Sequence, residues 1–140
     1  MSVMQVEVVS SEQNIYSGEA SFVVVPTVQG ELGIYPRHEP IMSLVRPGAL
    51  RLTVPGEDKE VLVAVSGGVL EVQPDKVTVL ADVAVRSAEM DQARAEEAKK
   101  AAEAGISQAK DDKDLVEAHK ALAAAIAQLK TLDYIRSHRK

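Results

Sequence analysis

Residues 77–86 read VTVLADVAVR, and residues 87–95 continue as SAEMDQARA. The first run is rich in valine, which favours strands, whereas the second is rich in alanine, which favours helices. The whole chain divides in the same way. Residues 1–86 contain 19 of the 20 valines, all six prolines and seven of the eight glycines, and residues 87–140 contain 14 of the 19 alanines and no proline. The composition therefore predicts two units, residues 1–86 and residues 87–140, that meet at Arg86–Ser87.

The first unit consists of short valine-rich segments in quick succession. Val3–Val9, Phe22–Pro26, Leu50–Val54 and Val61–Val65 are examples, separated by turns rich in Gly, Pro and Asp. Short, evenly spaced segments with no helical segment between them are typical of antiparallel sandwiches and barrels. We therefore expect residues 1–86 to form an antiparallel β-sandwich of about ten strands.

Two glycine-containing stretches in this unit have alternative interpretations. The pair Gly67-Gly68 can form either a phosphate-binding nest or a tight turn or bulge into which no side chain fits, and the lack of a Gly-Lys-Ser/Thr sequence favours the turn or bulge. Residues 30–40 read GELGIYPRHEP and predict a shaped loop. Its apolar side chains either pack into the end of the sandwich, which the residues alone favour, or contact a partner.

The second unit predicts an antiparallel hairpin of two helices. Ser87 is the expected N-cap of the first helix, Gly105 is expected to weaken or end it, and Asp111, Asp112 and Asp114 are cap candidates for the second. A stripe spaced alternately by 3 and 4 residues follows, which is the pattern of a helix that packs on a partner helix. It consists of Leu115, Ala118, Leu122, Ala125, Leu129 and Leu132.

The first helix offers mostly alanine to this stripe. Because an alanine contact removes much less apolar surface from water than a leucine contact, the hairpin should separate at modest cost. We therefore expect residues 87–140 to form an arm with two states, one folded on the sandwich and one opened to place the leucine stripe on another surface.

Charge and residue types exclude several functions. The net charge of −5 resides in residues 1–86, which makes nucleic acid an unexpected partner. The basic C-terminal residues either meet an acidic partner or complement the helix dipole. There is no cysteine, signal peptide or membrane-spanning apolar run. His38, His119 and His138 form no metal-binding motif, and no nucleophile motif is present, so we do not expect the chain to be an enzyme by itself.

The order and spacing of several short motifs resemble one known family. These motifs are Val8-Val9-Ser10, Ser17-Gly18, residues 30–36 with His38 and Pro40, Arg46-Pro47-Gly48, Ser66-Gly67-Gly68, residues 70–74, residues 77–82 and residues 125–129. Over essentially its whole length, the chain resembles the epsilon subunit of bacterial F-type, proton-translocating ATP synthases. The fold of that family is a ten-stranded sandwich followed by a helical hairpin.

This resemblance implies a non-catalytic subunit of the central rotor stalk that couples the catalytic head to the ring of c subunits. The sandwich would bind the gamma subunit and the c-ring, with contact residues Glu31, Gly33, Ile34, Tyr35 and His38. The hairpin would inhibit ATP hydrolysis by extending toward the alpha and beta subunits, with Lys120, Lys130, Arg136, Arg139 and Lys140 facing the beta subunits. The resemblance also implies a peripheral position on the cytoplasmic face of the bacterial inner membrane, without direct membrane insertion.

Some members of the family bind ATP on the hairpin through a motif that reads here Met90-Asp91-Gln92-Ala93-Arg94-Ala95. The resemblance makes Asp91, Arg94 and Ala95 a candidate weak ATP site. Ala124 and Gln128 stand where strong binders are expected to carry arginines. Since one arginine compensates a triphosphate poorly, we expect weak ATP binding or none and no required cofactor. The alternatives are a nucleotide-sensing module closed by ATP and a free-standing adaptor with a coiled-coil tail.

Overall fold

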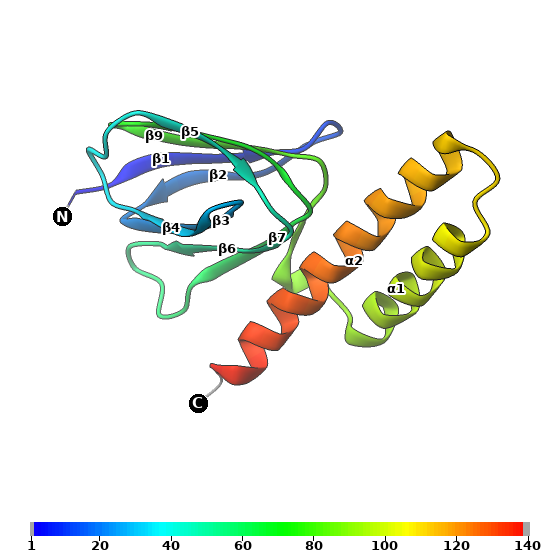
Figure 1. Cartoon of the computed structure of the whole chain (residues 1–140). Helices are drawn as coiled ribbons and strands as arrows, with labels where there is room; N and C mark the ends of the chain where they lie inside the picture. The colour runs from blue at the N-terminus through cyan, green and yellow to red at the C-terminus, as the bar shows by residue number, and fades with distance from the viewer. Residues whose placement is uncertain (1, 139–140) are drawn as a thin grey trace.

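The structure is a computed structural model that describes residues 2–138. Within these residues, ten strands form one unit and two helices project from it as a hairpin (Figure 1). The elements in chain order are β1 (Met4–Val9), β2 (Asn14–Ala20), β3 (Phe22–Thr27), β4 (Gly30–Ile34), β5 (Ile41–Val45), β6 (Gly48–Thr53), β7 (Val61–Val65), β8 (Gly68–Gln73), β9 (Lys76–Ala81), β10 (Ala84–Arg86), the 3₁₀ turn η1 (Ser87–Glu89), α1 (Gln92–Ser107) and α2 (Asp112–Ser137).

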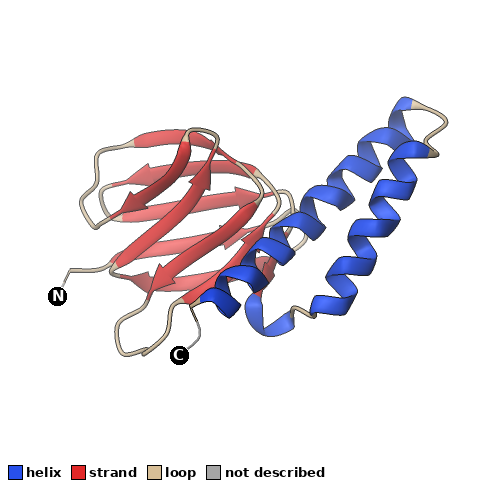
Figure 2. Ribbon diagram, turned by 60° about the horizontal axis from the view of Figure 1, so that its bottom comes forward, coloured by secondary structure: helices blue, strands red, loops and turns tan. Residues whose placement is uncertain are grey.

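The strands form a single sheet that folds into two layers (Figure 2). Its order is β10-β7-β6-β3-β5-β8-β9-β1-β2, with β4 on the other side of β3. Only the pair Thr27–Val45 joins β3 to β5, so the sheet turns there. We call β10, β7, β6, β3 and β4 the arm layer, and β5, β8, β9, β1 and β2 the far layer. All pairings are antiparallel except that of β1 with β9.

The core lies between the layers and is built from alternate residues of each strand. In β6 and β7, Leu50, Leu52, Val63 and Val65 are fully buried and belong to one cluster with the valines of β1, β3, β8 and β9. This alternation follows from the two-residue period of a strand, which sends successive side chains to opposite faces. The predicted fold, a ten-stranded β-sandwich followed by a hairpin of two helices, is confirmed.

The connection into the hairpin differs from the prediction. Ser87 does not cap a helix, because the chain first makes the short turn η1 and then an extended step at Met90. The N-cap of α1 is Asp91, whose carboxylate accepts a hydrogen bond from the Arg94 backbone N–H at 3.0 Å. The cap at Asp111 of α2 is confirmed by the corresponding bond from Asp114 N–H at 2.8 Å.

Of the two alternatives for Gly105, that it ends the first helix is wrong, because it lies inside α1. A Cβ atom at this position would lie 3.3 Å from the Cβ of Ala118, so the glycine lets α2 approach closely. The stretch 30–40 is not a single loop either. Its first half is strand β4, which pairs with β3 from Thr27–Gly30 to Val23–Ile34.

The glycine pair between β7 and β8 is a tight turn, as predicted. Both residues have positive φ values, 128° at Gly67 and 139° at Gly68. A Cβ atom on Gly68 would lie 2.0 Å from the carbonyl oxygen of Leu80, which is backbone that cannot rotate away. The position therefore requires glycine for both conformation and space.

Replacement of Gly68 by alanine should destabilise the sandwich strongly. We expect Gly68→Ala to lower the free energy of unfolding by about 3 kcal/mol or more, since it combines a strained φ with a backbone clash. Gly56→Ala is the matched control, because Gly56 has φ +86° but no atom within 4 Å of the added Cβ, and it should cost only about 1–2 kcal/mol. Urea unfolding of both variants measures the difference, and equal losses would contradict this account of the turn.

Candidate functional site

The arm sits on the outer face of the arm layer. Leu62 and Ala64 of β7 point away from the core, because their neighbours Val63 and Val65 point into it. They are nevertheless only 8% and 2% exposed. The cover is α2, which contacts β6 and β7 (Figure 2). The contact of α2 with β6 and β7 therefore fixes the position of the arm on the sandwich.

The face of α2 that lies on the sandwich carries small side chains. Ala127 and Thr131 are 1% and 0% exposed and are spaced one helical turn apart. The Thr131 hydroxyl donates to the Ala127 carbonyl oxygen at 2.8 Å, so it requires no partner from the sandwich. Small residues on both sides let the helix approach closely, but they remove little apolar surface from water.

A polar cluster closes the C-terminal end of this interface. The Tyr134 hydroxyl of α2 donates to Glu60 Oε1 at 2.5 Å. The guanidinium of Arg51 in β6 lies under the Tyr134 ring, with Cζ 4.7 Å from the ring centroid. Arg51 also faces two carboxylates, with Nη1 3.6 Å from Glu31 Oε2 and Nε 3.7 Å from Glu60 Oε2. We call Glu31, Arg51, Glu60 and Tyr134 the latch cluster.

Two further contacts extend the cluster along α2. Lys130 Nζ donates to the carbonyl oxygen of Pro47 at 3.4 Å, and the His138 ring stacks on the Tyr134 ring at a centroid distance of 4.0 Å. Burial raises the pKa of Tyr134 above its usual range, and the hydrogen bond to Glu60 and the charge of Glu60 raise it further. The interface thus favours the protonated, donating form of Tyr134.

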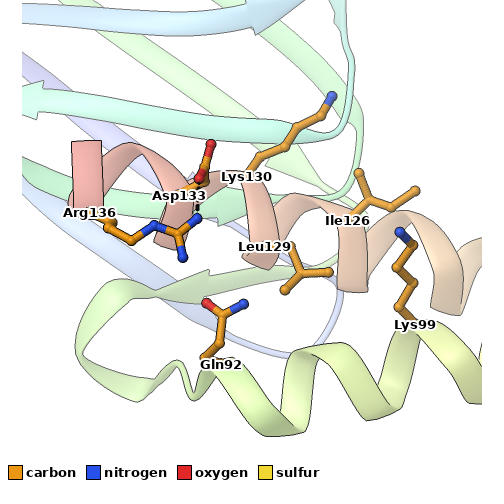
Figure 3. A pocket seen from close by; sticks show the side chains of 7 residues that line it. All are labelled: Gln92, Lys99, Ile126, Leu129, Lys130, Asp133 and Arg136. Atoms are coloured by element: carbon orange, nitrogen blue, oxygen red, sulfur yellow. Dashed lines mark hydrogen bonds and ion pairs between the residues drawn. The ribbon is translucent and has the colours of Figure 1, made fainter. Parts of the chain in front are cut away.

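An open groove of about 330 Å³ runs between the two helices (Figure 3). It is lined by Gln92 and Lys99 of α1 and by Ile126, Leu129, Lys130, Asp133 and Arg136 of α2. Figure 3 shows Arg136 turned toward Asp133, with which it forms an ion pair. The groove is thus lined by two apolar side chains, three cations, one amide and one carboxylate.

The predicted ATP-site residues lie beside this groove rather than in its lining. The carboxylate of Asp91 caps α1, and Ala95 is only 2% exposed. Arg94, whose N–H is bonded to Asp91, is exposed on the first turn of α1. The interaction of this motif with a nucleotide stays a prediction.

The residues predicted to contact the c-ring and gamma do not gather at one point. Glu31, Gly33 and Tyr35 share the outer face of the arm layer, but Glu31 and Tyr35 are four residues apart along an extended chain, about 13 Å. Tyr35 is 65% exposed and packs on Phe22. His38 Nδ1 donates a hydrogen bond to the carbonyl oxygen of the next residue, Glu39, at 2.7 Å. Ile34 is fully buried in the core, so its side chain is part of the core and not of a contact surface.

The basic residues predicted to face the beta subunits lie on different sides of α2. Lys120 and Arg136 are separated by 16 positions, which places them on nearly opposite sides of a helix with 3.6 residues per turn. Lys130 lies at the sandwich interface through its bond to Pro47. Arg139 and Lys140 lie outside the described residues.

Sequence reasoning missed the latch cluster and an apolar row on the far layer. The row consists of Leu44, Val69, Leu80 and Val9, which lie directly opposite one another on β5, β8, β9 and β1. Leu44 and Leu80 are 59% and 53% exposed. An exposed apolar row on a sheet is typical of a docking surface. Its signal in the sequence is the apolar residue at the outward position of each strand.

Neither a metal site nor a membrane span is found in the described part of the chain. Among residues 2–138, no three His, Cys, Asp or Glu side chains come together as ligands. Over the same residues, neither helix combines the length and the apolar composition needed to cross a bilayer.

Alkaline pH should release the arm. Because the pKa of Tyr134 is raised in the docked state, docking is fully favoured below the ordinary tyrosine pKa of about 10 and is lost as pH rises through the raised value. Energy transfer between dyes on cysteines introduced at the exposed residues Asp58 and Lys113 would follow this change. Tyr134→Phe keeps the ring but lacks the hydroxyl, so its profile should be flat over that range. An identical alkaline transition in the variant would refute the role of Tyr134.

Comparison with known proteins identifies the family. The model of the ATP synthase delta/epsilon chain β-sandwich domain matches residues 3–87, and that of the delta/epsilon chain long α-helix domain matches residues 88–133. An ATP synthase epsilon chain of Neisseria meningitidis serogroup C / serotype 2a is 97% identical over 140 residues, which is 100% of both chains. An ATP synthase epsilon chain of Laribacter hongkongensis is 62% identical over 136 residues, 97% of both chains.

The fold is also similar to that of solved structures. A chain in the Euglena gracilis mitochondrial ATP synthase structure (OSCP/F1/c-ring) has a TM-score of 0.71 at 21% identity, covering 97% of this chain and 82% of that one. A chain in the central stalk/c-ring structure of Tetrahymena thermophila mitochondrial ATP synthase has a TM-score of 0.58 at 16% identity, with 91% and 96% covered. The chain belongs to the family of epsilon subunits of bacterial F-type ATP synthases.

Proposed function

We propose that the chain is a non-catalytic subunit of the central stalk of a proton-translocating F-type ATP synthase, in which it couples the catalytic head to the c-ring and restrains ATP hydrolysis through its arm. The observation that carries this proposal is the interface between arm and sandwich. This interface consists of small side chains, Leu62 and one polar cluster, so it holds the arm in a defined place at a modest cost of release.

The sandwich offers two surfaces for the partners of such a subunit. The apolar row on the far layer suits the gamma subunit, because exposed leucines favour a stable protein contact. The outer face near Glu31 is charged and half-exposed, and it suits the c-ring. Membership in the family and the fold shared with chains from c-ring-containing assemblies support both assignments. The subunit would then lie peripherally on the cytoplasmic face of the bacterial inner membrane.

In this proposal the released arm is the form that inhibits ATP hydrolysis. Once α2 leaves the sandwich, Lys130 loses the Pro47 carbonyl and can join Lys120, Arg136, Arg139 and Lys140 in contacts with acidic segments of the alpha and beta subunits. The distribution of Lys120, Lys130 and Arg136 around α2 suits a helix that is surrounded by partners, since these cations point in different directions from its axis.

Two changes to the arm should raise hydrolysis by the assembled enzyme. Deletion of residues 87–140 removes the inhibitory element, so we expect retained assembly and a several-fold higher rate of ATP hydrolysis. A cross-link between cysteines introduced at Arg46 and Lys130, which line the same cleft, should hold the arm on the sandwich and raise hydrolysis to the same level. The natural chain has no cysteine, so within this subunit only the introduced pair reacts.

The cross-link experiment has its control in the two single-cysteine variants treated with the same reagent. Cleaving a reversible cross-link should restore inhibition. Loss of assembly on deletion, or unchanged hydrolysis in the cross-linked enzyme, would contradict the proposed role of the arm.

Nucleotide is not the main element that holds the arm. We expect no ATP binding at micromolar concentration to the isolated chain in calorimetry, because Asp91 is engaged as a cap and α2 presents Ala124 and Gln128 where arginines would be needed. The double variant Ala124→Arg, Gln128→Arg places two cations one turn apart and should gain binding. A micromolar dissociation constant for the natural chain would favour the nucleotide-sensing alternative.

A further inference from the structure

We propose that Arg51 couples the surface around Glu31 to the docking of the arm, so that a partner cation that binds Glu31 weakens the hold on Tyr134. Glu31, Glu60 and Tyr134 are far apart in the sequence, but all three lie beside the guanidinium of Arg51. The Glu31 carboxylate faces the guanidinium of Arg51, which also lies under the Tyr134 ring.

The guanidinium of Arg51 is shared between the carboxylates of Glu31 and Glu60 and forms a close ion pair with neither. Its distances to Glu31 and Glu60, 3.6 Å and 3.7 Å, are both beyond hydrogen-bond range. Its Nε atom is buried and makes no hydrogen bond, although the side chain as a whole is 21% exposed. A buried donor without an acceptor is costly, so the guanidinium gains whenever it moves fully onto one carboxylate.

When a partner cation takes up Glu31, the guanidinium of Arg51 moves toward Glu60. The guanidinium is a rigid plane, so a shift toward Glu60 changes its position under the Tyr134 ring. It also neutralises Glu60 more fully, which makes Glu60 a weaker acceptor for the Tyr134 hydroxyl. Both changes weaken the hold of the sandwich on α2.

The chemistry of the partner follows from the exposure of Glu31. Its side chain is 50% exposed on β4, while that of Arg51 is largely covered. A lysine or arginine of a partner can therefore reach the carboxylate of Glu31 from solvent. By reciprocity, release of the arm would strengthen the binding of that partner by the same factor. This step rests on the proposed function only in taking Glu31 to face a partner subunit.

The coupling can be measured in the full chain without any partner. Ala64→Cys introduces a single thiol at a position that is 2% exposed and is covered by the arm, outside the sandwich core. Its rate of labelling by a thiol reagent reports how often the arm opens. Glu31→Gln, which imitates a carboxylate taken up by a cation, should raise this rate about three- to tenfold. Glu31→Lys should raise it further, because it repels Arg51.

The decisive comparison repeats Glu31→Gln in the Arg51→Gln background, where it should leave the labelling rate unchanged. Glu71→Gln on β8, a strand of the far layer, is the matched control and should not alter the rate in either background. No effect of Glu31→Gln, or an equal effect with and without Arg51, would overturn the coupling. Since the assembled enzyme is absent from this test, its failure is distinguishable from failure of the proposed inhibition of hydrolysis.

Discussion

The close approach of α2 to the outer face of β7 is the constraint on which the arrangement of the two units depends. Small residues on both sides make it possible, Ala64 beside Leu62 on the strand and Ala127 with Thr131 on the helix. The same small residues limit the apolar area that is removed from water, and burial of such area is the main stabilising term in most interfaces. A helix seated in this way is placed accurately and held weakly.

Specific polar contacts therefore decide the balance between docked and released arm. Tyr134 presents its aromatic face to Arg51 and its hydroxyl to Glu60. One side chain is thus held by a residue of β6 and by the residue that precedes β7. A cation–π contact amounts to about 0.5–2 kcal/mol, and a hydrogen bond to a charged acceptor to about 1.5–3 kcal/mol. These values are comparable to the burial of one leucine side chain, and hence sufficient to control the arm.

The sequence predicts the parts of this structure that have a local pattern. Alternating valines predict the strands, and the change to alanine after Arg86 predicts the helices. It does not predict the latch cluster, because Glu60 and Tyr134 are 74 positions apart and neither stands in a motif. The two smaller differences from the prediction, the N-cap of α1 and strand β4, have local causes. Asp91 caps α1 in place of Ser87, because the chain makes a 3₁₀ turn first, and residues 30–34 form a strand because β3 offers a free edge.

The two faces of α2 contact different partners, and both contacts bear on how the arm opens. The leucine-containing stripe faces α1, where Ala118 meets Gly105 and Leu129 lies beside Gln92 and Lys99. The face with Ala127 and Thr131 meets the sandwich. The leucines of the stripe are only partly buried, and the buried residues of the hairpin include Ala95, Ala102 and Ala125. A buried leucine contributes roughly 1.5–3 kcal/mol and a buried alanine much less, so the contact between the helices is also weak. A partner that covers the leucine stripe can therefore separate the helices as well as lift the arm from the sandwich.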